Sequence, residues 1–563
     1  MSSSRPASDA PGTTAKWWVL AVVVAGTFML LLDTTIVNVA IPSIQRNLGA
    51  TYGAIEWVVS GYALAFGLVL IPAGRIGDRF GHRRLFILAL GGFTITSLLC
   101  GTSTSPQELV AWRIVQGGMA GILNPQILAM VQVSFAPAER GKAFAFYGAT
   151  AGAATALGPL LGGILVSADI HGLGWRPIFL LNVPIGVVAL VAGSRLLPRS
   201  RGAGGGIDGA GIALVALSLM LILYPLIDGR SAGWPVWSFV ALGLSLPVLG
   251  SFIAWQGRRV SAARVPLVDI RLFRFRAFAA GTSLGLTYFA GFTSVFFSLS
   301  LWLQLGLGRS ALETGLTILP FAVGSLVGSA LSDIASRRLG ADCLKVGTSM
   351  VAIGLGTTLA AIYAAGDTVP GLLLLPSLAF AGIGSGLTIA PNTNAVLARV
   401  PLASAGAAGG VLSTAQRVGT ALGVAIVGVL LFGALAQGAP SAAAARAVPL
   451  NHELIGQGLS SPARRHILQT FGTCFDRRAG SADPSIAPRG CPGQSQSPSP
   501  LSATLEHAGR LALAQDFTSA TVISMWFNVG AVVLAFLLAF LFPRGRGARR
   551  AASPGGEASA QGA

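Results

Sequence analysis

The stretch WWVLAVVVAGTFMLLLDTTIVNVAI, residues 17–41, is apolar along nearly its whole length and contains one ionisable side chain, Asp33. An apolar run of about 20 residues is long enough to cross the hydrocarbon core of a bilayer as a helix. The run is also too long for the core of a cleaved signal peptide. It therefore predicts a retained transmembrane helix.

Thirteen more runs of this kind follow, bounded by clusters of Arg, Gly and Pro. The chain of 563 residues is 53% hydrophobic and 10% charged, whereas about 25% of the residues of a soluble domain are charged. This composition excludes a soluble protein and predicts an all-α polytopic membrane protein. The fourteen predicted spans are 17–41, 55–72, 85–104, 107–134, 142–168, 176–197, 210–227, 236–256, 277–304, 311–331, 343–364, 371–391, 405–434 and 517–542.

The basic residues indicate the orientation of these spans. With the N-terminus inside the cell, most of the 38 Lys and Arg residues lie in the tails and inner connectors. The short outer connectors contain Arg46, Arg176, Arg230 and Arg309. Because an excess of basic residues marks the cytoplasmic side, both termini are expected in the cytoplasm. Topology and contacts with membrane lipid explain the net charge of +18, and nucleic-acid binding is not expected.

The four cysteines fall into two classes. Cys100 and Cys343 lie in apolar runs and are expected to be buried, inert thiols. Cys474 and Cys491 lie in the connector 435–516, which is rich in Ala, Ser, Pro and Gly and is expected outside the cytoplasm. Much of 437–500 is expected to lack fixed structure. There they can form a disulfide bond, and two free thiols are the alternative.

An internal repeat divides the chain into two halves. The sequence TALG at 155–158 recurs at 420–423, and GGMAGILNPQ at 117–126 is similar to GIGSGLTIAPN at 382–392, both at an offset of 265 residues. This offset maps spans one to six onto spans nine to fourteen and leaves spans seven and eight as an inserted pair. Parallel six-helix halves around a central site are typical of transporters that work by alternating access. The predicted units are a cytoplasmic tail, a six-helix bundle, the inserted pair, a second six-helix bundle and a cytoplasmic tail, at 1–16, 17–200, 201–260, 261–542 and 543–563.

Two opposite charges are predicted at matching depth in the first half. Asp33 in the first span and Arg113 in the fourth both lie on the order of 10 Å below the outer surface. A charge inside a span costs about 2.5–3.5 kcal/mol on insertion scales, so each is a functional candidate. A carboxylate that gains or loses an Arg partner as the protein moves is suited to proton coupling. A purely structural buried pair is the alternative.

A polar face on the fourth span is predicted to line a substrate cavity. Arg113, Gln116 and Asn124 follow helical spacing on that span. Thr34 and Asn38 follow the same spacing from Asp33 on the first span. The remaining cavity candidate is Arg417, which lies within the thirteenth span without an obvious carboxylate partner in that half. Glu56 begins the second span at the outer interface, where a solvated carboxylate is the preferred interpretation.

Two glycine-rich segments are predicted to shape helix contacts. The connector GRIGDRFGHRR, residues 74–84, has glycines that permit a tight cytoplasmic turn, with Asp78 at or near a helix end. A plain positive-inside anchor is the alternative for its arginines. In the fifth span Gly158 and Gly162 form a small-residue face, and Pro159 between them predicts a kink.

Together these motifs resemble the major facilitator superfamily, and within it the family of fourteen-span drug:proton antiporters. Several independent stretches carry the resemblance, which extends over about 17–542. They are LLDTTIVNVAIPSIQ (31–45), GRIGDRFGHRR (74–84), WRIVQGGMAGILNPQ (112–126), ALGPLLGG (156–163), WRPIFLLNVPIG (175–186) and SALETGLTILP (310–320).

The resemblance implies the major-facilitator fold, two six-helix bundles plus two inserted central helices, and it implies roles for particular residues. Asp33 would be the proton-linked carboxylate and Arg113 the arginine of the proton relay. The gate between spans two and three would comprise Gly74, Asp78, Arg79, Gly81 and Arg83. The antiporter bend of the fifth span would comprise Gly158, Pro159, Gly162 and Gly163.

Some positions depart from the family pattern. Ala154 stands where the fifth-span motif often has glycine, and His82 where the loop motif often has arginine. The order Gln416–Arg417 is reversed relative to the usual thirteenth-span pattern. No clear mid-membrane acid is found in the second half, which argues against export of dications.

The resemblance implies proton-coupled export of drugs, antibiotics or similar amphiphilic small molecules across the bacterial plasma membrane. The expected driving force is the proton-motive force without a cofactor, and a monomer is expected. The alternative is a dedicated exporter of an endogenous secondary metabolite, siderophore or lipid precursor. An enzyme is not expected, since the five histidines are scattered through predicted connectors, no metal-ligand set is present and the GxxxxGK[ST] motif of ATP-driven pumps is missing.

Overall fold

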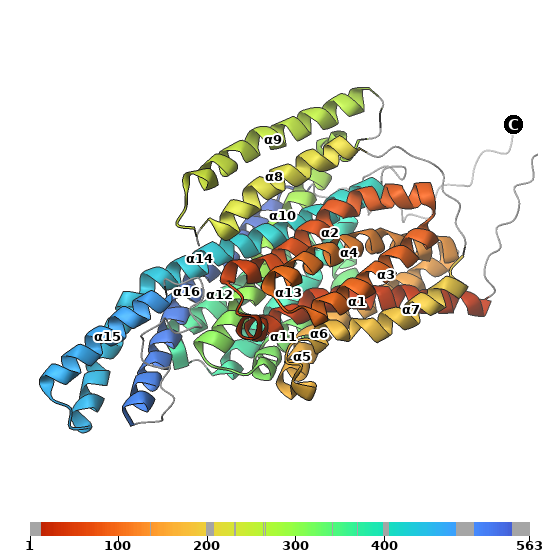
Figure 1. The fold of residues 1–563 in the computed structure, drawn as a ribbon. Coiled ribbons are helices and arrows are strands. Elements are labelled where there is room, and N and C mark those ends of the chain that lie inside the picture. The colour runs from red at the N-terminus through yellow and green to blue at the C-terminus, as the bar shows by residue number, and fades with distance from the viewer. Residues whose placement is uncertain are drawn as a thin grey trace, which may run out of the picture.

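The computed structural model is an assembly of long helices that lie roughly side by side (Figure 1). No strand occurs among the residues that it describes, and thirteen of its helices are long and apolar enough to cross a membrane. A further helix, α5, occupies the position of the predicted fifth span. An all-α membrane fold is therefore confirmed. The described residues are 13–135, 137–198, 208–229, 232–262, 264, 266–340, 342–368, 370–397, 405–479 and 500–542.

The elements follow one another through short connections. In the first half they are α1 (Thr13–Leu48), α2 (Tyr52–Phe80), α3 (His82–Thr102), α4 (Pro106–Ser134), α5 (Pro137–Ala168), η1 (Ile170–Gly172), α6 (Pro177–Leu180) and α7 (Asn182–Leu196). Two helices follow, α8 (Gly209–Asp228) and α9 (Val236–Ser261). The second half comprises η2 (Ile270–Arg274), α10 (Arg276–Leu301), η3 (Trp302–Gly306), α11 (Ala311–Leu339), α12 (Asp342–Ala365), η4 (Gly366–Thr368), α13 (Gly371–Leu397), α14 (Ala405–Gly456), α15 (Ser461–Ala479) and α16 (Pro500–Ala539).

Capping residues explain where several helices begin. The side chain of Thr51 accepts a hydrogen bond from the backbone N–H of Ala54 at the start of α2, and Ser105 does the same for α4. At the start of α11, Ser310 and Glu313 form a reciprocal capping box. Glu313 therefore caps the N-terminus of α11.

The two halves meet along two helix pairs. Helix α2 packs against α14, and α5 packs against α11. The inserted helices α8 and α9 lie side by side at one edge of the assembly (Figure 1). The apolar side chains of α8 cover both α2 and α14, in a cluster that includes Leu64, Leu223 and Ala425. The inserted pair therefore lies over the boundary between the halves.

Polar bonds hold both ends of α8. At its C-terminal end Asp228 accepts a hydrogen bond from Nε1 of Trp57 on α2, at 2.9 Å. At its N-terminal end the buried carboxylate of Asp208 accepts hydrogen bonds from Trp255 and Gln256 of α9 and from the backbone of Leu267. The inserted pair is thus fastened to the first half at one end and to the segment leading into α10 at the other.

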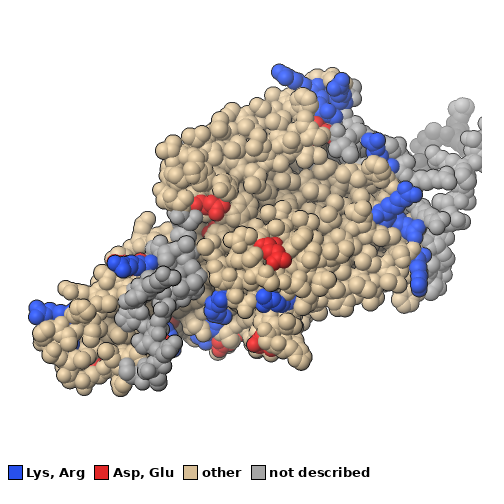
Figure 2. Space-filling model, in the orientation of Figure 1, with Lys and Arg blue, Asp and Glu red and all other residues tan. Residues whose placement is uncertain are grey.

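Charged side chains are segregated along the molecule. Figure 2 shows Lys and Arg side chains gathered at one end of this face, separated by a broad uncharged band from the charges toward the other end. This distribution suits a protein whose middle lies in a bilayer.

The long connector of the second half corrects one expectation. Within 435–479 the described residues are largely helical rather than without fixed structure, because α14 continues to Gly456 and α15 follows. Helix α16 begins at Pro500, and residues 480–499 lie outside the described part of the chain. Alanine, a strong helix former, recurs through the extension of α14. Side chains from these extensions, among them Leu454, Phe471 and Ala512, form a small apolar core of their own. This core supplies the burial that composition alone did not predict.

Candidate functional site

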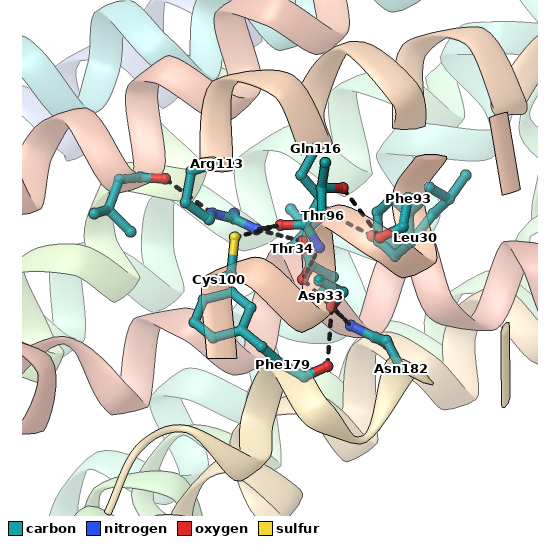
Figure 3. Close-up of polar contacts among 12 residues, drawn as sticks. Leu30, Asp33, Thr34, Phe93, Thr96, Cys100, Arg113, Gln116, Phe179 and Asn182 are labelled. Carbon is teal, nitrogen blue, oxygen red and sulfur yellow. Dashed lines mark hydrogen bonds and ion pairs between the residues drawn. The ribbon is translucent and has the colours of Figure 1, made fainter. Parts of the chain in front are cut away.

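The carboxylate of Asp33 lies in the interior of the first half and is completely buried (Figure 3). Its Oδ2 accepts a hydrogen bond from Nη1 of Arg113 on α4, at 2.7 Å. Its Oδ1 accepts hydrogen bonds from Nε2 of Gln116, at 3.2 Å, and from Nδ2 of Asn182 on α7, at 3.4 Å. Side chains from α4 and α7 therefore bond to one carboxylate on α1. All three partner groups donate hydrogen bonds, which an ionised carboxylate accepts.

Arg113 has further partners that hold it in place. Its Nη1 also donates to Oε1 of Gln116, at 2.6 Å, and its Nε donates to the backbone oxygen of Val58 on α2, at 3.2 Å. The guanidinium carbon lies 4.1 Å from the ring centre of Tyr62. The cation is thus balanced by Asp33 and oriented by α2.

An outer set of polar contacts orients the partners of Asp33. Nδ2 of Asn182 also bonds to Oγ of Ser97, at 3.1 Å, and that hydroxyl donates to the backbone oxygen of Phe179, at 2.9 Å. The thiol of Cys100 donates to Oε1 of Gln116, at 3.6 Å. Sequence reasoning quoted the stretch containing Asn182 but gave this residue no role. An amide within an apolar span was the available signal.

Close helix packing explains why these groups meet. Gly117 and Gly121 of α4 lie against the backbone of Tyr62 and Phe66 on α2, where a side chain at either position would overlap it. The helical spacing from Arg113 to Gln116 then presents both side chains to α1. Small residues on one face and polar residues on the next therefore bring the ion pair together.

The other predicted cavity residues take different places. The hydroxyl of Thr34 bonds to its own helix at the oxygen of Leu30, and Asn124 is half-buried on α4. The backbone oxygen of Asn38 accepts a hydrogen bond from Oγ of Ser300 on α10, at 2.6 Å, so Asn38 lies at a contact between the halves. Arg417 lies apart from the Asp33 cluster, with its guanidinium carbon 4.1 Å from the ring centre of Phe66.

The predicted bend of the fifth span contacts both halves. A Cβ on Gly162 would lie 2.9 Å from the backbone oxygen of Ile36 on α1, and a Cβ on Gly158 would overlap the side chain of Thr35 on the same helix. Gly163 faces the other way, where a Cβ would lie 2.8 Å from the backbone oxygen of Ala311 on α11. Pro159, inside α5, lies against Gly315 of α11. This segment therefore links the helix that carries Asp33 to the second half.

The connection between α2 and α3 is a single residue. Gly81 has a φ of 94°, a conformation that favours glycine, and its N–H bonds to the oxygen of Gly77. Nδ1 of His82 lies 2.7 Å from Oε1 of Gln126 on α4, and Arg83 donates to the backbone oxygen of Ser194 on α7. The turn is therefore bonded to α4 and α7, two helices of its own half.

Gly74 and Arg79 are the other described residues of the predicted gate. Arg79 lies over the ring of Phe80, and Gly74 has no neighbour that a Cβ would meet within 4 Å. The side chain of Asp78 lies outside the described part of the structure.

Two buried acids differ from the sequence-based expectation. Glu56 is 2% exposed and lies against Gly428 of α14, so the expectation of a solvated carboxylate is wrong. Asp516 of α16 is also 2% exposed and lies against Gly438. The predicted start of the last span at 517 excluded it. In both cases a glycine on α14 makes room for a carboxylate brought by another helix.

The cysteines fall into the two expected groups as far as they are described. Cys100 and Cys343 are buried free thiols, and Cys474 on α15 is disulfide-bonded. Cys491 lies outside the described residues. Within the described ranges no three His, Cys, Asp or Glu side chains are grouped so as to hold a metal ion.

Comparison with known proteins identifies the family. The family model described as Major Facilitator Superfamily matches residues 23–424. The probable actinorhodin transporter of Streptomyces coelicolor is 34% identical over 542 residues, covering 95% of this chain and 93% of that protein. A puromycin resistance protein of Streptomyces alboniger is 36% identical over 430 residues, covering 75% of this chain and 83% of that protein.

Comparison with solved structures gives the same fold. A bacterial homologue of the human lysosomal transporter Spinster, solved in an inward-facing and unoccupied conformation, has a TM-score of 0.58 at 17% identity and covers 94% of this chain and 98% of its own. At this identity the likeness shows the fold alone. The family model and the Streptomyces relatives together confirm the resemblance found in the sequence motifs. The chain belongs to the Major Facilitator Superfamily.

Proposed function

We propose that this protein is a proton-driven antiporter that exports drugs, antibiotics or similar amphiphilic molecules across the bacterial plasma membrane. The observation that carries the proposal is the buried Asp33, held by Arg113, Gln116 and Asn182 from two other helices. The names of the relatives, which include antibiotic export and resistance proteins, support the class of substrate. We place both termini in the cytoplasm, since the arginine distribution favours that orientation.

Contacts between the halves connect Asp33 to a change of access. Near the outer end of α1, the backbone oxygens of Asn38 and Val39 accept hydrogen bonds from Ser300 and from Gln304, at 2.6 and 2.9 Å. These bonds close the halves on the outer side and must break when that side opens. Asp33 lies little more than one turn away on the same helix. Movement of α1 would therefore change the surroundings of the carboxylate and let it take a proton from outside.

The energy for export comes, in this proposal, from protons that enter as the substrate leaves. One proton moving down a potential of 100 mV supplies about 2.3 kcal/mol, to which a pH gradient adds. No cofactor and no chemical step on the substrate are required. We propose a monomeric transporter, because the residues that form the site all belong to one chain.

The test is transport by purified protein in liposomes under an imposed pH gradient, with and without an uncoupler. We expect gradient-driven transport to be lost in Asp33→Asn. Asp333→Asn is the matched control, because that side chain is 72% exposed on α11. Coupled transport by Asp33→Asn at the unaltered rate would overturn the proton assignment.

A second candidate is the dedicated export of an endogenous secondary metabolite. The observation in its favour is that the relative named as a probable actinorhodin transporter matches this chain over nearly its whole length. In that case disruption of the gene would make the host sensitive to its own product and leave its sensitivity to unrelated drugs unaltered. A broad loss of drug resistance would favour the first candidate.

A further inference from the structure

Arg417 is a cation at the boundary between the two halves. It belongs to α14, and its guanidinium carbon lies 4.1 Å from the ring centre of Phe66 on α2. Phe66 is at the midpoint of α2, so the cation is near the middle of the membrane span. Gly67 makes this approach possible, since a Cβ there would lie 3.0 Å from that of Arg417.

The guanidinium groups of Arg417 and Arg113 have different partners. Arg113 is neutralised by Asp33 at 2.7 Å. For Arg417, none of the described carboxylates lies within ion-pair distance. An arginine without an acid at this depth is costly, and contact with an aromatic ring offsets only part of that cost. The site therefore has positive charge left to balance.

The surroundings of Arg417 are aromatic and hydroxylic. The side chains of Tyr62 on α2 and Tyr147 on α5 lie in the neighbourhood of its guanidinium. Tyr62 is the ring that also lies under Arg113, at 4.1 Å. Tyr62 is thus close to both arginines, Arg417 and the Arg113 of the ion pair.

A second aromatic segment runs beside the cation. Oγ1 of Thr293 on α10 lies 3.2 Å from Oγ1 of Thr420 on α14, one turn from Arg417. A Cβ on Gly285 of α10 would lie 3.4 Å from Cγ of Gln416. The segment of α10 between these contacts carries half-buried phenylalanines at 289 and 292, whose rings lie 5.8 Å apart. Phenylalanine side chains therefore lie on the stretch of α10 that packs against α14.

Arg417 itself is only half-buried, although it lies mid-helix between the halves. A guanidinium with free donors presents a planar fork suited to a carboxylate or a similar anion. A neighbouring aromatic surface suits a flat ring system. The alternative is that Arg417 only joins the two halves through its cation–π contact with Phe66. In that case the protein would show no preference between anionic and cationic substrates.

We propose that Arg417 is the anion-binding residue of the substrate site, and that the substrates are flat aromatic molecules bearing a carboxylate or an ionised phenol. The proposal rests on the proposed function and specifies its substrate class. The anion pairs with the guanidinium of Arg417, and the ring system packs on the aromatic side chains of α2 and α10. Protonation at Asp33 then occurs in a neighbouring group of residues, which shares Tyr62 with the anion site.

The test compares two dyes that share a xanthene ring but differ in charge, anionic fluorescein and cationic rhodamine 123. Binding to the full-length protein in detergent is measured by fluorescence polarisation. We expect the wild type to bind fluorescein more tightly, and Arg417→Gln to weaken that binding about tenfold or more while leaving rhodamine 123 unaffected. Arg309→Gln is the matched control, because Arg309 is an exposed outer arginine 40% accessible to solvent.

A second variant keeps the test valid if Arg417→Gln does not fold. Arg417→Lys retains the charge but loses the planar fork, and we expect it to weaken fluorescein binding by a smaller factor. The elution volume on size exclusion reports the folding of each variant. Equal loss of both dyes in Arg417→Gln, or tighter binding of rhodamine 123 by the wild type, would overturn the proposal.

The two proposals fail in different ways. If a pH gradient drives rhodamine 123 but the protein shows no Arg417-dependent binding of fluorescein, proton-driven export stands and the anion site is wrong. If fluorescein binds through Arg417 but neither dye responds to the gradient, the anion site stands and the proton coupling is wrong.

Discussion

Glu56 of α2 and Gly428 of α14 meet across the boundary between the two halves, in such a way that a Cβ on Gly428 would overlap the carboxylate of Glu56. One half contributes a buried acid and the other contributes the space for it. Tyr52 and Phe432 stack one turn further out, with ring centres 3.8 Å apart. In the proposed orientation these are the outer ends of the two halves, and the contacts there leave little room.

Gly428→Val is expected to force α2 and α14 apart at the outer end. Overpacking of this kind costs about 1–3 kcal/mol, and here that cost destabilises the state in which these two helix ends are in contact. The measurement is the distance between spin labels at the exposed positions Arg46 and Ala436, which should lengthen. Gly433→Val is the control, since nothing lies within 4 Å of a Cβ at that position. An unaltered distance in Gly428→Val would contradict this account of the closure.

Loss of one member of the Asp33–Arg113 pair is expected to destabilise the protein more than loss of both charges. Arg113→Gln leaves a buried carboxylate without its cation, which costs about 3–5 kcal/mol. Asp33→Asn combined with Arg113→Gln removes both charges and should recover much of that loss. Thermal unfolding in detergent measures the three variants. If the double variant is as unstable as the sum of the single ones, the two residues are not coupled.

Asp208 is expected to make stability depend on pH at the inner end of the inserted pair. Burial raises the pKa of its carboxyl, but hydrogen bonds from Trp255, Gln256 and the N–H of Gly211 outweigh it and hold the pKa below the ordinary value. A lowered pKa in the folded state gives stability that is present above about pH 4 and is lost as the pH falls through the folded pKa.

The corresponding variant is Asp208→Asn. We expect it to be less stable than the wild type by about 1–3 kcal/mol at pH 7 and to approach the wild type below about pH 4. The measurement is thermal unfolding across that pH range, with exposed Asp333→Asn as the reference. A difference that is the same at every pH would show that the charge of Asp208 contributes nothing.

Gly163→Val is expected to reduce transport by preventing close contact between α5 and α11. The added side chain would meet the backbone of Ala311 and Leu312, neither of which can move independently of its helix. Gly118→Val on α4, where no atom lies within 4 Å of a Cβ, should retain most of the activity. Initial rates in liposomes distinguish the two. Equal rates would mean that the contact at Gly163 plays no part in the transport cycle.

The helices and the candidate residues inside them were largely predictable from local patterns. Apolar runs of sufficient length predict spans wherever they occur, because a helix in a bilayer satisfies its own backbone hydrogen bonds. An acid and an arginine within such runs were conspicuous for their cost, and the structure places Asp33 and Arg113 2.7 Å apart. The repeat offset likewise required no knowledge of contacts.

Burial at the helix ends was not predictable in this way. Glu56 and Asp516 lie near the predicted limits of spans, where a side chain is solvated or buried according to what the neighbouring helix offers. Gly428 and Gly438 on α14 decide the matter, and α14 is distant from Glu56 in the sequence. The helical extension of α14 and the role of Asn182 were missed for the same reason, since both depend on partners brought by the fold.

The sequence by itself determined that the chain forms membrane-crossing helices in two related halves, with Asp33, Arg113 and Arg417 inside the spans. Length, hydropathy and the cost of charge in hydrocarbon are properties of single segments and can be seen along the chain. Only the tertiary structure decided which of these charges is paired, because pairing depends on distances between helices. It gave Arg113 a carboxylate and gave Arg417 the ring of Phe66.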